Sequence, residues 1–300
     1  MIDSLVSLFI TAFYHQKATT LQETACESDP DASADHFIRA GAVCESQEQY
    51  KEALVQFNRA LEIQQQFLLP NNPTLVNTYD RIAHAHVKLE QFEEALTFYK
   101  KALEVEQNSL SADHPAIATS YFNICKAYVS LSLWFEAVEY NMKAIEQLRN
   151  RFDANITILA GYIHYLGYIY HQQQQYQEAL IYYEEALELY HGQGLENDAS
   201  LAVVYHRTGS AYYQINRFDE ALRLYQKTLN IELITLPDNA ETIATTYSNL
   251  STAYRGLKRY DEAIIAAEQA VDQLMKTLPY NHRDVIQQRL YLETLKSNRR

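Results

Sequence analysis

One motif recurs at a fixed spacing through most of this chain. An alanine preceded by a glutamate occurs every 42 residues, without an insertion, at Ala53, Ala95, Ala137, Ala179, Ala221 and Ala263. An aromatic residue stands three positions before each of these alanines, as Tyr50 and Trp134 do in two of the copies. Self-similarity at a period of this length indicates a repeat architecture, in which similar units stack on their neighbours.

Further positions keep the same register and fall at helical spacings. Small residues stand twelve positions before the alanine, at Gly41, Ala83, Cys125, Gly167, Gly209 and Ser251. Spacings of 3, 4 and 7 place the recurring residues on one face in each of two helical segments per repeat. Glycine and proline number only 7 and 6, which favours helices joined by short connections. We therefore predict an all-α solenoid of antiparallel helix pairs, with small residues at the crossings and aromatic residues beside them.

The spacing within a repeat is similar to that of the tetratricopeptide repeat (TPR). Its W-x2-L-G-x2-Y and A-x3-F positions are matched by Ile163, Leu166, Gly167, Tyr170, Ala179 and Tyr183. The 42-residue form, with the pair His114-Pro115 opening a repeat, resembles the kinesin light chain subtype. The resemblance covers residues 31–300. It implies a TPR superhelical solenoid.

The register divides the chain into predicted segments. Residues 1–30 are expected to form a helix or degenerate half-repeat and a loop, and residues 283–300 a capping helix. Between them lie six predicted repeats: 31–72, 73–114, 115–156, 157–198, 199–240 and 241–282. Two repeats depart from the aromatic position that follows the alanine by four, with Asn141 and Ala267. We expect different packing at these two places.

Charge and cysteine content limit the classes of partner. A net charge of -13 disfavours nucleic acid and anionic membranes as partners, because both require a basic surface. The three cysteines, Cys26, Cys44 and Cys125, show no metal-binding spacing and favour a reducing compartment. The apolar run at 5–14 follows an aspartate instead of a basic segment, which disfavours a secretory signal. No apolar stretch has the length of a membrane span. We expect a cytoplasmic protein.

The TPR resemblance implies that the first helix of each repeat lines a concave groove that binds extended peptides. Opposite its core positions, this helix carries six cations, Arg39, Arg81, Lys88, Lys126, Arg207 and Arg255. It also carries three anions, Asp35, Glu45 and Asp80. The face is therefore positive on an acidic chain, and it predicts attraction of acidic segments.

Aromatic, amide and imidazole side chains share this face. They are Phe122, Asn123, His164, Tyr165, Tyr168, His171, His206, Tyr213 and Asn249. The resemblance implies that the asparagines contact the backbone of a bound peptide, and aromatic residues among cations favour an aromatic anchor in the ligand. With the six cations, all of these except His171 and Tyr213 form the predicted peptide-binding groove. The alternative is a solvated face that binds nothing.

No motif for catalysis stands out. The chain contains neither a phosphate-binding loop nor a fixed nucleophile triad. His164, His171 and His206 leave a metal site as an alternative, although polar contacts to a ligand are favoured. We therefore predict a non-enzymatic scaffold or adaptor without a cofactor, which binds acidic or aromatic-acidic peptide segments of other proteins. Two alternatives stay open: a regulatory portion of a larger multidomain enzyme or signalling protein, and a structural protein that self-associates.

Overall fold

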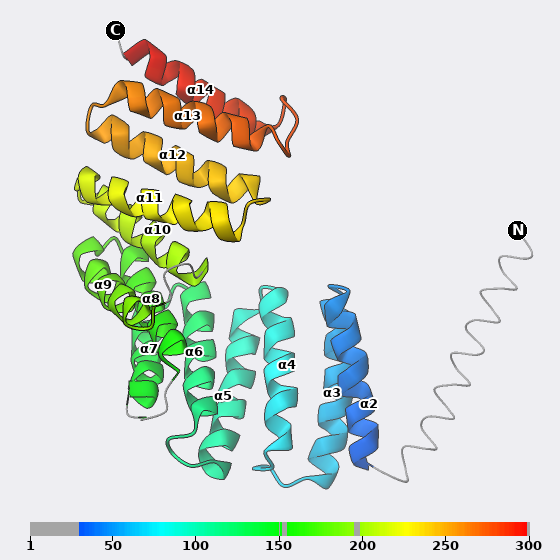
Figure 1. Cartoon of the computed structure of the whole chain (residues 1–300). Coiled ribbons are helices and arrows are strands. Elements are labelled where there is room, and N and C mark those ends of the chain that lie inside the picture. Colours follow the sequence, from blue (N-terminus) through cyan, green and yellow to red (C-terminus); the bar gives the residue numbers. More distant parts are fainter. Residues whose placement is uncertain (1–29, 150, 152–154, 195–198, 299–300) are drawn as a thin grey trace, which may run out of the picture. The chain divides into compact units, whose positions relative to one another are not determined.

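A computed structural model of the chain describes residues 30–149, 151, 155–194 and 199–298 (Figure 1). These residues form thirteen helices, and no strand occurs among them. The predicted all-α fold is therefore confirmed. The helix or half-repeat predicted before residue 30, like Cys26, falls outside the described residues.

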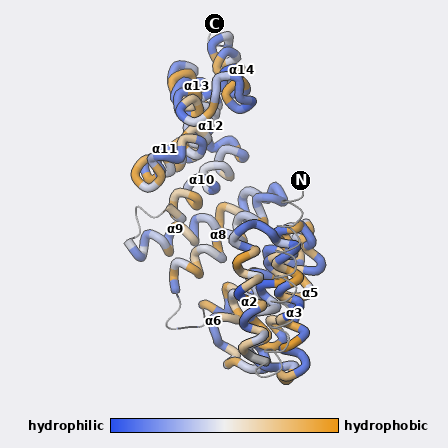
Figure 2. The backbone as a smooth tube through the Cα atoms, turned by 90° about the vertical axis from the view of Figure 1, so that its right-hand side faces the viewer, coloured by the Kyte–Doolittle hydropathy of each residue, from blue (hydrophilic) through white to orange (hydrophobic). Residues whose placement is uncertain are grey.

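The chain divides into two compact units, Met1–Tyr140 and Asn141–Arg300, and the boundary falls inside one helix, α7 (Trp134–Arg149). The first unit contains α2 (Pro30–Ser46), α3 (Tyr50–Phe67), α4 (Thr74–Lys88), α5 (Phe92–Ser109), α6 (Pro115–Ser130) and the start of α7. The second contains α8 (Ile156–Gln172), α9 (Tyr176–Gly192), α10 (Ala199–Gln214), α11 (Phe218–Thr235), α12 (Ala240–Gly256), α13 (Tyr260–Leu274) and α14 (Arg283–Asn298). From α2 to α6 and from α8 to α14, each helix packs against the next one in the chain. Figure 2 shows hydrophobic and hydrophilic residues mixed along the helices, as expected where one face is buried.

Small residues and aromatic rings meet at the helix crossings, as predicted. All six recurring alanines have no exposed surface. A Cβ atom built on Gly167 would lie 2.6 Å from the ring of Tyr183, and one on Gly41 would lie 2.4 Å from the ring of Phe57. Both distances are far below a normal carbon–carbon contact. The aromatic residue four positions after the alanine therefore fills the space that the small residue leaves.

The turns inside the repeats use a backbone conformation that the sequence did not reveal. One residue in each turn is left-handed, with φ between 58° and 62°, at Glu48, Glu90, Ser132, Gln174, Asn216 and Lys258. These positions again follow one another at 42 residues. None is a glycine, although a side chain in this conformation costs roughly 1–2 kcal/mol. The scarcity of glycine thus correctly indicated short connections. In these tight turns, however, residues other than glycine adopt the left-handed conformation.

Side-chain caps begin several of the helices. His114 caps α6, where its Nδ1 accepts a hydrogen bond from the backbone N–H of Ala116 at 3.2 Å, and Pro115 follows in the first turn. Asn155 caps α8, because its Oδ1 accepts hydrogen bonds from the backbone N–H groups of Thr157 and Ile158. Because proline lacks an N–H that the first turn would leave unpaired, the His-Pro pair is well suited to start a helix. Its role in this chain is structural.

Buried polar residues recur eleven positions after the alanine. They are Gln64, Glu106 and Glu232, all less than 7% exposed. Burial raises the pKa of Glu106, opposed by a hydrogen bond with Ser120, and raises the pKa of Glu232, opposed by a hydrogen bond with Thr246. Each carboxyl therefore meets a hydroxyl on the helix that follows. The sequence analysis missed these pairs, although the shared position in the register marks them.

The two departures at the aromatic position have different outcomes. Asn141 is fully buried, and neither atom of its carboxamide has a hydrogen-bond partner among the described residues. Ala267 is also fully buried, but it belongs to an apolar cluster with Leu292 and Leu295 of α14. In the sixth repeat, the leucines of α14 thus fill the space beside the small Ala267. The third repeat instead carries an unsatisfied polar group, which costs about 1–3 kcal/mol.

Candidate peptide-binding site

The second unit gathers predicted groove residues around one arginine. Arg207 of α10 is half-buried, and its guanidinium carbon lies 4.4 Å from the centre of the Tyr168 ring on α8. Tyr168 packs in turn against Tyr165, with 5.4 Å between ring centres. His164 and Tyr168 are one helical turn apart on α8, so they face the same neighbour. The cation therefore rests on an aromatic surface, a favourable arrangement.

Three imidazoles surround this arginine and stay neutral. Burial, and then the charge of Arg207, lowers the pKa of His164 to about 4. The same two causes lower the pKa values of His171 and His206. The Nε2 atom of His164 is buried and has no hydrogen-bond partner among the described residues. At neutral pH, the positive charge of this cluster thus resides on Arg207.

A hydrogen bond connects the cluster to α12, the first helix of the following repeat. The Nδ2 atom of Asn249 on α12 lies 2.7 Å from Nε2 of His206. A donating carboxamide requires an unprotonated Nε2, and the lowered pKa of His206 favours that state. We call Tyr168, His171, His206, Arg207 and Asn249 the Arg207 site.

Among the described residues, no carboxylate neutralises Arg207. Within the described part of the chain, its guanidinium forms neither an ion pair nor a hydrogen bond; its contact is with the Tyr168 ring. The aromatic face leaves the five N–H donors of the guanidinium unused. A half-buried guanidinium of this kind suits a carboxylate, which can accept two parallel hydrogen bonds from it.

Of the two arginines at the corresponding position in the first unit, Arg39 and Arg81, the second is already paired. Nη1 of Arg81 on α4 lies 3.0 Å from Oε2 of Glu45 on α2, and Nδ1 of His84 lies 3.0 Å from the other carboxylate oxygen. Next to Arg81, burial and the nearby charge of Glu106 raise the pKa of Asp80 to about 7. Here one of the anions counted on the face, Glu45, neutralises Arg81.

The remaining predicted residues lie apart from these two clusters. Lys126 lies over the ring of Phe122 at 5.2 Å on α6, and Asn123 is half-buried beside it. Arg39 and Lys88 are exposed. Arg255 at the end of α12 lies 5.5 Å from the ring centre of Tyr291, a residue that the prediction did not include.

A trough with a volume of about 460 Å³ lies between α12 and α14. Its lining residues are Glu241, Ala244, Thr245, Ser248, Asn249, Thr252, Leu274, Asp284, Gln287, Gln288 and Tyr291. Asn249 is the only predicted site residue among them. The seventh first helix, α14, is needed to close this trough, and the sequence analysis treated that segment only as a cap.

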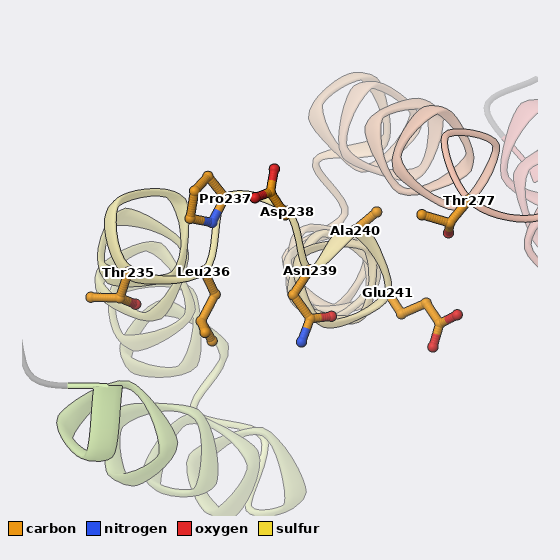
Figure 3. Close-up of a pocket in the computed structure, with 8 residues that line it drawn as sticks. All are labelled: Thr235, Leu236, Pro237, Asp238, Asn239, Ala240, Glu241 and Thr277. Atoms are coloured by element: carbon orange, nitrogen blue, oxygen red, sulfur yellow. The ribbon is translucent and has the colours of Figure 1, made fainter.

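A second hollow, of about 520 Å³, lies at the loop between α11 and α12 (Figure 3). Figure 3 shows the side chains of Asp238 and Glu241 pointing in different directions, so the two carboxylates do not converge on one ligand. Asn239 is occupied in capping α12 through the backbone N–H of Thr242 at 3.1 Å. This hollow is therefore a feature of the loop and of the cap of α12, and its side chains do not form a ligand site.

The described residues contain no group of three histidine, cysteine, aspartate or glutamate side chains that could hold a metal ion. The three imidazoles of the second unit contact tyrosine rings, Ser210 and Asn249 instead. Buried Cys125 has its pKa raised to about 12 by burial, which leaves its thiol protonated and unreactive.

Comparison with known families decides the identity of the repeats. The tetratricopeptide repeat matches residues 31–104, 74–150 and 158–232, and a second form of the same repeat matches residues 243–284. The chain is a tetratricopeptide repeat protein. Repeats of this family indicate a protein-interaction scaffold, and TPR domains generally bind protein partners.

Solved structures agree with this fold. BtubC (BKLC) from P. vanneervenii has a TM-score of 0.63 and 20% identity, and the match covers 85% of this chain and 94% of that one. A Podosopora anserina protein with nearly identical TPR-like repeats, named after kinesin light chain, has a TM-score of 0.59 and 20% identity, over 69% and 98% of the two chains. The TPR protein therefore resembles kinesin light chain, as its sequence indicated.

A larger protein also contains this fold. A signal transduction ATPase with numerous domains from Pyrococcus horikoshii, which carries a tetratricopeptide repeat sensor, has a TM-score of 0.72 and 18% identity. The match covers 98% of this chain but 43% of the ATPase. Curated proteins give no match. None of the described helices has the length and apolar character that crossing a membrane requires.

Proposed function

We propose that this TPR protein is a non-enzymatic adaptor that holds extended acidic or aromatic-acidic segments of partner proteins, with the Arg207 site as the main anchor. The observation that carries this proposal is the half-buried guanidinium of Arg207, which rests on Tyr168 and has no anion beside it among the described residues. A protein that keeps an arginine in this state leaves it available to the carboxylate of a ligand.

The neighbouring side chains suit the rest of such a ligand. Tyr165 and Tyr168 offer aromatic surface against which an apolar or aromatic side chain can pack. The neutral imidazoles provide hydrogen-bonding atoms without competing for the carboxylate. On a chain with a net charge of -13, this local positive charge would focus the potential that attracts an acidic segment.

The predicted groove residues of the first unit would add weaker contacts. Exposed Arg39, Lys88 and Lys126 can attract acidic residues at long range, and Phe122 and Asn123 can contact the ligand directly. Exposed charges contribute mainly to the rate of association and are screened by salt. Arg81 would contribute less, because Glu45 already occupies its guanidinium.

The test is a peptide-display selection against the protein, followed by binding measurements on the enriched peptides at low and high salt. We expect acidic peptides with an aromatic residue to be enriched and to bind more weakly as the salt concentration rises. Enrichment of basic peptides alone, or of none, would overturn the proposal. In that case the acidic remainder of the surface would be the candidate binding site, and folded proteins instead of peptides would be the candidate partners.

A second function has support from one comparison. The repeat sensor of the Pyrococcus horikoshii ATPase has the same fold over 98% of this chain, so these repeats could serve as the sensing part of a related multidomain protein. Extension of the coding sequence into a catalytic or nucleotide-binding domain would support that role. A cytoplasmic location agrees with the low cysteine content of the chain. Mass measured by light scattering over a range of concentrations tests self-association.

A further inference from the structure

The trough between α12 and α14 has a polarity opposite to that of the Arg207 site. Its eleven lining residues include two carboxylates, Glu241 and Asp284, and no lysine, arginine or histidine. Six further lining residues carry a side-chain amide or an aliphatic hydroxyl group: Thr245, Ser248, Asn249, Thr252, Gln287 and Gln288. A surface of this composition suits a polar ligand with a positive charge.

The trough is formed by one stripe of residues on each of two parallel helices. On α12 the lining residues are 241, 244, 245, 248, 249 and 252, and on α14 they are 284, 287, 288 and 291, so both sets follow the spacing of a single helical face. The contacts Ser248–Gln288 and Ser251–Tyr291 join residues 40 apart, so both helices run in the same direction. Residues 241 to 252 span about 16 Å, the length of four or five residues of extended peptide.

The carboxylates lie at one end of this stripe, and the one basic side chain recorded against them among the described residues is the imidazole of His282. Glu241 and Asp284 are exposed residues in the first turns of α12 and α14. Nδ1 of His282 lies 3.6 Å from Oδ2 of Asp284, but the same nitrogen is 3.4 Å from the backbone N–H of Asp284 and accepts from it. Neither carboxylate forms an ion pair with a lysine or arginine of the described residues.

The amides in the middle of the trough have unused hydrogen-bonding capacity. The hydroxyl of Ser248 donates to Oε1 of Gln288 at 3.2 Å, which fixes that carboxamide and leaves its Nε2 atom buried without an acceptor among the described residues. A buried N–H group without a partner costs about 1–3 kcal/mol, which a turn of this carboxamide towards a ligand carbonyl would recover. Asn249 also lines the trough and bonds to His206, so the trough and the Arg207 site share this residue.

We propose that the α12–α14 trough binds a short extended segment of the partner, whose backbone contacts the side-chain amides and whose lysine or arginine is neutralised by Glu241 and Asp284. The inference rests on the proposed function, since it extends the same ligand beyond its acidic anchor. The ligand is therefore bipolar: its carboxylate faces Arg207, and a basic residue follows at the other side of Asn249.

The test repeats the peptide selection with three full-length chains. They are wild type, the double variant Glu241→Gln/Asp284→Asn, and the control Glu293→Gln, which removes an exposed charge from α14 outside the trough. Wild type and control should enrich peptides that contain acidic residues and one lysine or arginine. The double variant should keep the acidic residues and lose the basic one. Circular dichroism and thermal melting show whether each chain is folded.

A binding cycle with one enriched peptide gives the quantitative answer. Replacing its basic residue by glutamine should weaken binding to wild type and to the control on the order of 5–10-fold, and leave binding to the double variant unchanged. Equal weakening on all three chains, or acidic peptides enriched without any basic residue, would overturn the trough but leave the Arg207 site intact. Failure to enrich acidic peptides would overturn the proposed function itself.

Discussion

Each unit carries an arginine fourteen residues before a recurring alanine, Arg81 in the first and Arg207 in the second, and the two differ in their partners; Arg39 holds the same position in the first repeat and is exposed. In the first unit, Arg81 reaches the preceding first helix and meets Glu45 at 3.0 Å. In the second unit, Arg207 reaches the preceding first helix and meets Tyr168, with the neutral imidazole of His171 nearby. Glu45 and His171 are themselves equivalent, since each stands eight residues before its alanine.

A charge on the repeat face is therefore not enough to make a binding site. One residue of the preceding repeat decides whether the arginine is consumed by an internal ion pair or left for a ligand. A paired arginine has exchanged its solvent for a carboxylate of the same chain, so a ligand must compete with that carboxylate. Exchanging the residues that differ between the two units tests this explanation.

The largest effect is expected for Arg207→Glu. Reversal of this charge should weaken binding of an enriched acidic peptide by roughly 100-fold, since it replaces a charge-assisted hydrogen bond by repulsion. The matched control is Arg81→Glu, for which we expect less than about a threefold change, because Arg81 is paired. Fluorescence anisotropy with both variants measures the difference. Equal losses would mean that the ion pair with Glu45 does not protect Arg81 from the ligand.

Asp80 of the first unit and His164 of the second should make opposite contributions to the dependence of stability on pH. The folded-state pKa of Asp80 is raised to about 7, so its contribution to stability is present at acidic pH and is lost as the pH rises towards 7. The pKa of His164 is lowered to about 4, so its contribution rises between pH 4 and 6.5 and is lost as the pH falls.

The test is thermal unfolding of Asp80→Asn and His164→Gln between pH 4 and pH 8. For Asp80→Asn we expect a gain in stability over wild type of roughly 2 kcal/mol at pH 8 and little change at pH 4. His164→Gln should be more stable than wild type at pH 4, whereas at pH 8 the two should differ less in stability. The opposite order for either variant would contradict the assigned cause, which is burial of the charged form.

A smaller effect is expected for His171→Glu. This change supplies the second unit with the carboxylate that the first unit has in Glu45, and Arg207 should then pair with it. Binding of the acidic peptide should weaken by about tenfold and become less sensitive to salt. His171→Gln keeps the size and removes only the imidazole, so it should change affinity by less than about threefold. Calorimetry of the two variants separates the new charge from the lost ring.

The smallest effect is expected for the reverse exchange, Glu45→Gln in the first unit. The change frees the guanidinium of Arg81, and we expect binding of acidic peptides to improve by about two- to threefold. The free energy of unfolding at neutral pH should change by less than about 1 kcal/mol, as is usual for an ion pair with an exposed partner. Weaker binding would show that Glu45 contributes to the site directly.

The repeat fold could be predicted from the sequence because its information is local and recurs. An alanine at a helix crossing must be small in every copy, so the 42-residue period and the buried face followed from residue types alone, and all six alanines are indeed fully buried. The His-Pro pair predicted a helix start, and His114 caps α6. The sequence placed Arg207, Tyr168 and His206 on one face of the first helices, and in the structure Arg207 lies against the ring of Tyr168 and close enough to His206 to lower its pKa.

Only the tertiary structure decided which of these side chains are available. The ion pair of Arg81 with Glu45, the hydrogen bond of Asn249 with His206 and the trough closed by α14 all join residues from different helices. Such contacts depend on the distance and rotation between stacked helices, which periodicity within a helix does not contain. The chain's own residues therefore determined which side chains share one face of the first helices. The packing of one repeat on the next decided which charges on that face are paired within the chain and which are not.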